Sequence, residues 1–199
     1  MRGSSADSLE EAIAKLFEDN KKRKVKENAR MILGKANESI IADLFGNDFG
    51  NEYTVINQPK GKYWIFYRAD KPYLTCTPDR LLINKETGEL EGLEIKDVEL
   101  VRKKDKEIWL CDELPINYLL QCVWYFVVFT DMKKVTLFPN LKFYSYADKK
   151  KTYEYSMHKR YTLYREDCEK LIAHCEKCAD GFWDNHIVKK VKPENKKGN

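Results

Sequence analysis

Hydrophobic and polar residues alternate along several short stretches of the chain, and a period of two is typical of a strand with one buried face. Turn-forming residues such as Gly, Pro, Asn and Asp separate many of these stretches. Residues 85–89, between two of them, have the composition of a hairpin turn. We therefore expect strands at residues 53–58, 63–68, 73–76, 80–84, 90–100, 135–138, 142–146 and 161–164.

Apolar residues recur at helical spacing in other segments. The stretch after Pro115 is apolar enough for a buried helix, although its aromatic and β-branched second half also suits a strand. Between residues 27 and 45 the apolar side chains, Leu33 and Ile40 among them, are expected to face inward, and Gly34 and Glu38 share one face. The expected helices span residues 7–19, 27–45, 115–129 and 165–185, with loops at 46–50 and 102–113.

This order of elements indicates an α/β fold, with a mixed sheet flanked by helices. The 199 residues suit one domain, expected over residues 1–187 and followed by a basic, flexible tail at 188–199. A hydrophobic content of 43% excludes a disordered chain, and a net charge of +4 neither requires nor excludes nucleic acid. Because no apolar run could span a membrane or direct secretion, we expect an intracellular protein.

Three of the six cysteines, Cys168, Cys175 and Cys178, lie close together near the C-terminus. A Cys-x-x-Cys pair beside His174 is found in some zinc and iron–sulfur sites. However, no second pair has ligand spacing, and Cys168 and Cys175 fall on one apolar stripe of the expected last helix. We therefore expect reduced and mostly buried thiols there.

Three charged residues on adjacent expected strands are the strongest sign of chemistry. Asp79 follows a Pro at the end of one strand, and Glu94 and Lys96 share one face of the next, because alternate residues of a strand point the same way. In one interpretation Glu94 and Lys96 form an ion pair on an edge strand and nothing is catalysed. In the other, the acids hold a divalent metal and an activated water. Glu38 and Gln121, on helices before and after this strand, favour the second.

Six short motifs follow one another along the chain, at residues 2–7, 33–38, 67–70, 75–79, 92–96 and 118–121. In content and order they resemble the PD-(D/E)XK nuclease core, and in finer detail its lambda-exonuclease and YqaJ-type viral recombinase branch. The chain departs from that pattern at Arg80, where Gly is common, at Asp97-Val98 after the Glu-x-Lys triplet, and at Val123 in place of a second Gln. The resemblance implies a restriction-endonuclease-like core.

The resemblance also implies roles for individual residues. Asp79, Glu94 and the backbone carbonyl of Ile95 would bind Mg²⁺, for which Mn²⁺ would substitute, with Glu38 near the metal directly or through water. Lys96 would orient or deprotonate the attacking water and offset charge on the phosphate. Gln121 would position the water or Lys96. These five residues make up the catalytic set that the sequence predicts.

The function implied is metal-dependent DNA exonuclease activity on duplex ends, in the 5′ to 3′ direction, for viral or phage recombination or genome processing. Implied partners are double-stranded DNA ends, a single-strand annealing protein and further copies in a ring, with no membrane. The location would be the host cytoplasm for a phage protein, and the nucleus or a viral factory for a eukaryotic virus. DNA contacts are expected at Arg2, Ser4, Ser5, Arg80, Arg102 and Lys103, in the basic segments 21–26, 102–106 and 149–160, and at Trp109 as a base-stacking wedge.

Other functions compatible with the same fold remain open. A structure-specific or nicking endonuclease would use the same catalytic groups. A CRISPR-type exonuclease would add an iron–sulfur cluster. A non-catalytic DNA-binding module would keep the fold, but Asp79, Glu94 and Lys96 are all intact, which argues against a decayed site.

Overall fold

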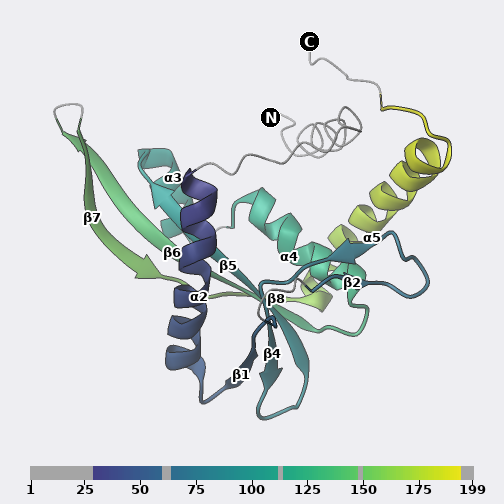
Figure 1. Cartoon of the computed structure of the whole chain (residues 1–199), viewed down its shortest axis with the longest axis horizontal. Helices are drawn as coiled ribbons and strands as arrows, with labels where there is room; N and C mark the ends of the chain where they lie inside the picture. Colours follow the sequence, from purple (N-terminus) through teal and green to yellow (C-terminus); the bar gives the residue numbers. More distant parts are fainter. Residues whose placement is uncertain (1–28, 60–63, 112–113, 148–149, 194–199) are drawn as a thin grey trace.

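A computed structural model describes residues 29–59, 64–111, 114–147 and 150–193 (Figure 1). The expected first helix at residues 7–19, the basic segment at 21–26 and the candidate DNA contacts Arg2, Ser4 and Ser5 lie outside the described residues. In the described part of the chain, no helix is both long enough and apolar enough to cross a membrane.

A mixed sheet forms the centre of the described structure. Its strands run in the order β1-β4-β5-β6-β7, and β8 pairs with β6 beside β7. The β5–β6 pair is parallel and the other pairs are antiparallel, so the predicted α/β fold with a mixed, restriction-endonuclease-like sheet is confirmed. The strands are β1 (Tyr53–Ile56), β4 (Arg80–Asn84), β5 (Leu90–Leu100), β6 (Lys134–Ala147), β7 (Lys150–His158) and β8 (Tyr161–Tyr164).

Helices cover both faces of this sheet, and alternate residues of β5 belong to different sides of the core. Leu93 and Ile95 pack with helix α2 (Ala29–Phe49), which buries Ile41, Ala42 and Phe45. On the other face, Leu100 belongs to the larger cluster that is formed with helices α4 (Ile116–Val128) and α5 (Arg165–Phe182). Glu94 and Lys96 therefore project toward the α4 side, because they have the same parity along the strand as Leu100.

One edge of β5 is open over half of its length. β4 pairs with β5 only from Arg80 opposite Leu93 to Ile83 opposite Leu90. Beyond that point, Glu94 to Leu100 pair with β6 alone within the described sheet. The place where β4 separates from β5, which we call the notch, lies directly beside Glu94 and leaves backbone groups of β5 available to other partners.

A small second sheet lies against the C-terminal helix. It pairs β2 (Phe66–Tyr67) with β3 (Thr75–Cys76), both shorter than the sequence predicts. Arg68 and Lys71 form ion pairs with Glu176 of α5, and Lys71 also binds Asp180. A short π-helix (Trp183–Val188) continues α5.

Three expectations about secondary structure are wrong. The segment expected to be a loop at residues 102–113 contains helix α3 (Lys103–Leu110), which buries Trp109 at 3% exposure. The two strands expected at 135–138 and 142–146 form one long strand, β6, and its partner β7 was not predicted. Helix α2 continues through residues 46–49, which were expected to be a loop.

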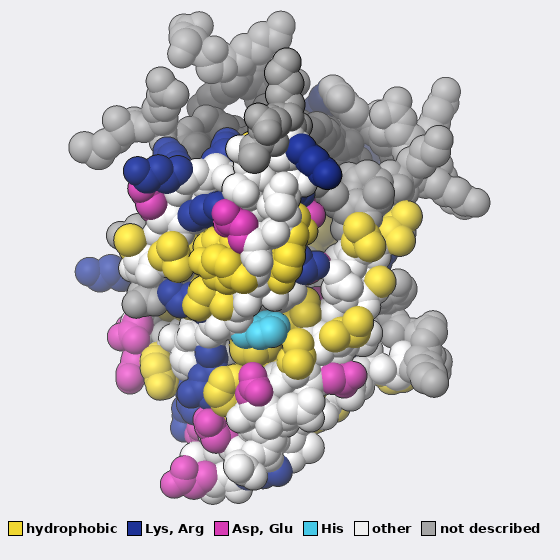
Figure 2. Space-filling model, turned by 90° about the vertical axis from the view of Figure 1, so that its left-hand side faces the viewer, with side chains coloured by type: hydrophobic (Ala, Val, Ile, Leu, Met, Phe, Trp, Pro, Cys, Tyr) yellow, Lys and Arg dark blue, Asp and Glu magenta, His cyan; other side chains and the backbone are white. Residues whose placement is uncertain are grey.

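The outer side of α2 is more apolar than its helical pattern indicates. Leu33 and Ile40, expected to face inward, are 58% and 59% exposed. Tyr146 and Tyr153, on the β6–β7 ribbon, are also exposed. Figure 2 shows the side on which β6 and β7 project, where hydrophobic side chains gather in the middle of the face with Lys and Arg beside them.

Two of the three cysteines of α5 occupy core positions, whereas Cys178 is exposed. Cys168 is buried, and Cys175 packs against the same cluster, so the apolar stripe expected from their spacing is present. Burial raises the pKa of both thiols. All six cysteines are free, and the described residues contain no group of three or more His, Cys, Asp or Glu side chains that could hold a metal ion.

Candidate active site

Glu94 and Lys96 lie side by side on β5, as their spacing predicts. The Lys96 ammonium donates a hydrogen bond to Oε1 of Glu94. Glu94 is completely buried, whereas the side chain of Lys96 is 23% exposed. The pair therefore combines a fixed, desolvated carboxylate with a cation that still reaches solvent.

Asp79 approaches the pair from across the notch, directly before β4 begins. Its Oδ2 accepts a hydrogen bond from the backbone N–H of Ile95 at 2.8 Å. Burial, followed by the negative charge of Glu94, raises the pKa of Asp79 to about 7. Two carboxylates thus share a desolvated region in which their repulsion is only partly offset by Lys96.

The charge state of Lys96 bears on what it can do. Burial acts to lower the pKa of Lys96, but the charge of Glu94 and the hydrogen bond to it outweigh burial, so the pKa is raised overall. The side chain is therefore a stable ammonium. An ammonium can orient a water or offset phosphate charge, but it cannot remove a proton.

Glu38 reaches the notch from α2, on the other side of the sheet. Its Oε1 accepts a hydrogen bond from Nη1 of Arg80 at 2.7 Å, and the same nitrogen donates to the backbone carbonyl of Asp79. The charge of Glu38 also contributes to the raised pKa of Asp79. Glu38 is therefore coupled to the site, with its carboxylate held by Arg80.

Arg80 has a different environment from the two expected. The sequence allowed it to contact phosphate or to point to solvent, but it is 8% exposed. Its Nε donates to Oδ1 of Asn57 at 2.8 Å, and Nη1 is used by Glu38 and Asp79. A guanidinium in this arrangement links three segments near the notch instead of presenting itself to DNA.

Helix α4 supplies the opposite wall. Tyr118 places its ring 5.9 Å from the Lys96 ammonium, and the hydroxyl of Tyr125 donates a hydrogen bond to Oε2 of Glu94. Gln121 lies three residues after the first tyrosine and four before the second, so the three side chains share one helix face. Gln121 is exposed, and its spacing places it on the same face of α4 as the two tyrosines.

Tyr125 is the residue of this site that sequence reasoning missed. It is 3% exposed, and in an apolar helix it reads as an ordinary core aromatic. The available signal was its position one helical turn after Gln121. A buried tyrosine hydroxyl needs a hydrogen-bond partner, and the partner here is the Glu94 carboxylate.

The donor atoms around the notch suit a hard divalent cation. Asp79 and Glu94 supply carboxylate oxygens, and their mutual repulsion is visible in the raised pKa of Asp79. The N–H of Ile95 points across the notch to Asp79, and its carbonyl points to the same edge, because N–H and C=O of one strand residue face the same way. Two carboxylates and one carbonyl match Mg²⁺, which keeps several of its waters.

The two departures after Glu94 lie away from these groups. Asp97 faces the α2 side, where it accepts hydrogen bonds from Asn37, Asn140 and Lys142 at 2.7–2.9 Å. Val123 is fully buried in the core. Neither substitution therefore removes a group from the notch.

The remaining candidate DNA contacts lie at the start of α3, beside the β6–β7 ribbon. Lys103 is 91% exposed and pairs with Glu107, and Arg102 is 81% exposed and forms two hydrogen bonds to Asp105. Trp109 is buried, so it is not available as a base-stacking wedge. Its backbone carbonyl instead accepts hydrogen bonds from Lys159 and Tyr161.

Comparison with known families agrees with this geometry. A family model described as the YqaJ-like viral recombinase domain matches residues 3–133. This range includes Glu38, Asp79, Glu94, Lys96 and Gln121, and it ends immediately before β6. No curated protein matches the chain.

Proposed function

Since the chain belongs to the family of YqaJ-like viral recombinase domains, we propose that it is a metal-dependent exonuclease that degrades DNA from duplex ends. Membership of this family makes it a nuclease of the type that acts in phage recombination. The direction of degradation that we propose is 5′ to 3′, and the setting is recombination or genome processing of a virus inside its host cell.

The observation that carries the proposal is the meeting of Asp79, Glu94 and Lys96 at the notch. One fully buried and one partly buried carboxylate beside one ammonium make a poor core and a good site for cation-assisted hydrolysis. Glu38 reaches the notch from α2, and Gln121 lies on the face of α4 that also carries Tyr118 and Tyr125, which supports a contribution from both sides of the sheet.

Each residue has a defined task in the proposed reaction. Asp79, Glu94 and the Ile95 carbonyl would hold Mg²⁺, with Glu38 nearby; the bound cation would lower the pKa of a water and offset charge on the phosphate. Lys96, as an ammonium, would orient the attacking water and stabilise the extra negative charge of the transition state. Gln121 would fix the position of that water. Hydrolysis would leave 5′-phosphate and 3′-hydroxyl ends.

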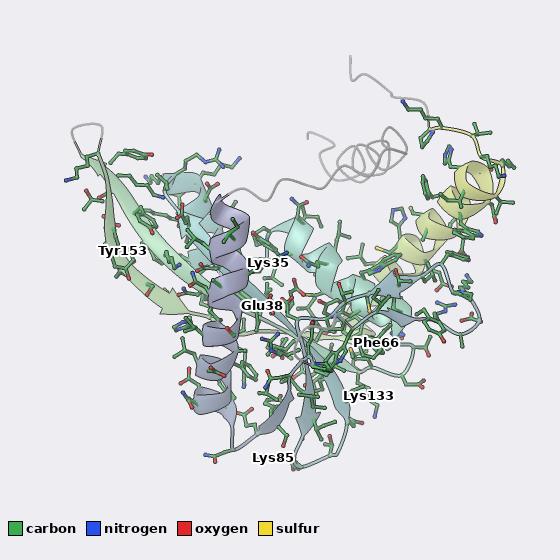
Figure 3. All side chains as sticks on the ribbon, viewed as in Figure 1. Lys35, Glu38, Phe66, Lys85, Lys133 and Tyr153 are labelled. Atoms are coloured by element: carbon green, nitrogen blue, oxygen red, sulfur yellow. The ribbon has the colours of Figure 1, made fainter. Side chains whose placement is uncertain are left out.

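The β6–β7 ribbon and α3 are proposed to contact the DNA beyond its end. Arg102, Lys103 and Lys150 are exposed on these elements. The exposed Tyr153 marks the ribbon in Figure 3, where it lies away from Glu38 and so away from the notch. Figure 1 shows the ribbon projecting from the sheet. Cations in this position suit the phosphates of a duplex whose end lies at the notch. A ring of several copies and a single-strand annealing protein are further proposed partners.

A digestion experiment tests the proposed activity. Linear duplex labelled at one 5′ end, the same duplex labelled at one 3′ end, and closed circular DNA are incubated with Mg²⁺ and, separately, with EDTA. Mononucleotides should appear from linear DNA alone and only with Mg²⁺, and the 5′ label should be released first. Glu94→Gln keeps nearly the same side-chain size but removes the charge that the cation requires, so it should reduce the rate by several orders of magnitude.

The other functions give different results in the same experiment. Cleavage of the circle would identify an endonuclease, and release of the 3′ label first would reverse the direction. Full activity in EDTA would exclude the metal-dependent mechanism. An iron–sulfur cluster would give brown protein, which is not expected because Cys168 and Cys175 are used in the core.

A further inference from the structure

Both oxygens of Glu94 are already bound, and by donors of different kinds. Lys96 binds Oε1 through a long, flexible stem whose side chain is partly exposed. Tyr125 binds Oε2 through a rigid ring that is almost completely buried. The two hydrogen bonds therefore differ in how easily they can be exchanged.

The ring of Tyr125 is fixed by its surroundings on β5. Gly92 lies two residues before Glu94 on the same face of the strand, directly under the ring. A Cβ atom at Gly92 would come within 3.0 Å of Cδ2 of Tyr125 and 3.3 Å of Sδ of Met132. The glycine thus provides the space in which the ring crosses the strand and reaches the carboxylate, and there is little room for the ring to move elsewhere.

The hydroxyl of Tyr125 is a permanent donor. A phenol is protonated at neutral pH, and this one is almost completely buried. A phenol that stays protonated must donate to an acceptor when it is buried, and Oε2 of Glu94 is the acceptor that it has. Lys96, by contrast, is partly exposed and can turn toward solvent if another cation takes its place at Oε1 of Glu94.

We propose that Tyr125 is a positioning residue whose hydroxyl stays hydrogen-bonded to Oε2 of Glu94. The other oxygen, Oε1, is then the one at which a divalent cation can replace Lys96. Lys96, once exchanged at Oε1, would be free to face the attacking water and the phosphate. The same event fills the site and places Lys96 for its task. This inference rests on the proposed function of the notch.

The test measures cation binding without DNA and without turnover. Mn²⁺ binding is followed by electron paramagnetic resonance of the free ion, for the original protein, Tyr125→Phe, Tyr161→Phe and Glu94→Gln. Tyr161→Phe is the matched control, because it also removes a buried tyrosine hydroxyl, one that donates to the Trp109 carbonyl at 3.0 Å. Thermal melting in EDTA is recorded for each protein.

Tyr125→Phe should weaken Mn²⁺ binding about 10- to 100-fold, the usual effect of removing a group that orients a metal ligand. Tyr161→Phe should bind Mn²⁺ as the original protein does, even if it melts earlier. A lower melting temperature for Tyr125→Phe with unchanged Mn²⁺ affinity would overturn the inference, since it would show a structural role alone. If Glu94→Gln also kept its Mn²⁺ affinity, the proposed function of the notch would fail instead.

A second variant keeps the inference testable if Tyr125→Phe does not fold. Gly92→Ala adds a methyl group against the ring and leaves every polar group in place. It should also weaken Mn²⁺ binding, because the ring must shift relative to Glu94. Unchanged affinity in a folded Gly92→Ala protein would mean that the position of the ring does not control the carboxylate.

Discussion

The carboxylate of Asp79 accepts a hydrogen bond from the backbone N–H of Ile95, with 2.8 Å between Oδ2 and N. This bond crosses the notch and brings a second acid close to the buried Glu94. The cost is visible in the pKa of Asp79, which burial and the neighbouring charge raise from 3.8 to about 7.

The raised pKa predicts how stability depends on pH. Between about pH 4 and pH 7 the folded protein holds a proton on Asp79 that the unfolded chain has lost, so the free energy of unfolding falls as pH rises through this range. In EDTA, Asp79→Asn should therefore be more stable than the original protein by about 2–4 kcal/mol at pH 8. Asn can still accept the hydrogen bond from Ile95.

Urea unfolding of both proteins at pH 4, 6 and 8 provides the measurement. The difference should be greatest at pH 8 and disappear near pH 4, where Asp79 is protonated in both states. A stability difference that does not change with pH would show that the charge of Asp79 is not its cause. Saturating Mn²⁺ should reverse the order at pH 8, because Asp79→Asn loses a ligand.

The Glu38–Arg80 ion pair should stabilise the protein as a coupled unit. Arg80→Ala removes hydrogen bonds to Glu38, Asn57 and the Asp79 carbonyl, so the free energy of unfolding should fall by about 2 kcal/mol or more. A double-mutant cycle with Glu38→Gln should give a coupling energy of about 1–2 kcal/mol. A coupling near zero, measured by urea unfolding, would contradict the ion pair.

Asp97 is expected to be structural in spite of its position next to Lys96. It faces the α2 side of the sheet and accepts hydrogen bonds from Asn37, Asn140 and Lys142. Asp97→Asn should lower the free energy of unfolding by about 1–3 kcal/mol, because Lys142 loses its charged partner. Nuclease activity per folded molecule should be unchanged. Loss of activity in fully folded protein would bring Asp97 into the site.

The β6–β7 ribbon should contact phosphates at a defined distance from the site. Pro139 is opposite Lys96, and Ala147, opposite Lys150, lies eight residues further along β6, about 26 Å away at ~3.3 Å per residue. This distance corresponds to about eight base pairs. Lys150→Gln should therefore weaken binding to a 20-base-pair duplex. The slope of the logarithm of the binding constant against the logarithm of the salt concentration should become less steep by about 0.9. Binding to a five-base-pair duplex should not change.

Lys85→Gln is the matched control for the ribbon, because it removes the same charge at the opposite end of the molecule (Figure 3). Fluorescence anisotropy at several salt concentrations, in EDTA to prevent cleavage, gives the affinities. Equal effects of the two substitutions would show a general charge effect, and the proposed contact of the ribbon would then be wrong.

The sequence predicted those elements whose pattern is produced by a buried face. The apolar residues that predicted β4 and β5 are there because these strands are buried over much of their length. β7 was missed because its tyrosines, lysines and threonine are mostly exposed, so no apolar face marks it. In α3 the composition is polar, and the burial of Trp109 depends on contacts with Tyr118 and Tyr161, which are distant in the sequence.

The site was predictable as far as it depends on local spacing. Glu94 and Lys96 are two residues apart on one strand, and Asp79 is marked by the turn before β4. The hydrogen bond from Tyr125 to Glu94 joins residues 31 positions apart, and no local pattern distinguishes this tyrosine from a core aromatic. The burial of Arg80 likewise depends on Glu38, 42 positions earlier.

β6 supports the candidate site although none of the site residues belong to it. Gly92 to Leu100 pair with β6 throughout, and Glu94 lies opposite Leu137. During synthesis β5 leaves the ribosome well before β6, so for that interval the strand that carries Glu94 and Lys96 has no parallel partner. A chain that stopped at residue 133, where the family match ends, would hold every proposed catalytic residue and still expose the bare edge of β5. Hydrolytic activity should therefore first appear in the nascent chain only after β6 has emerged.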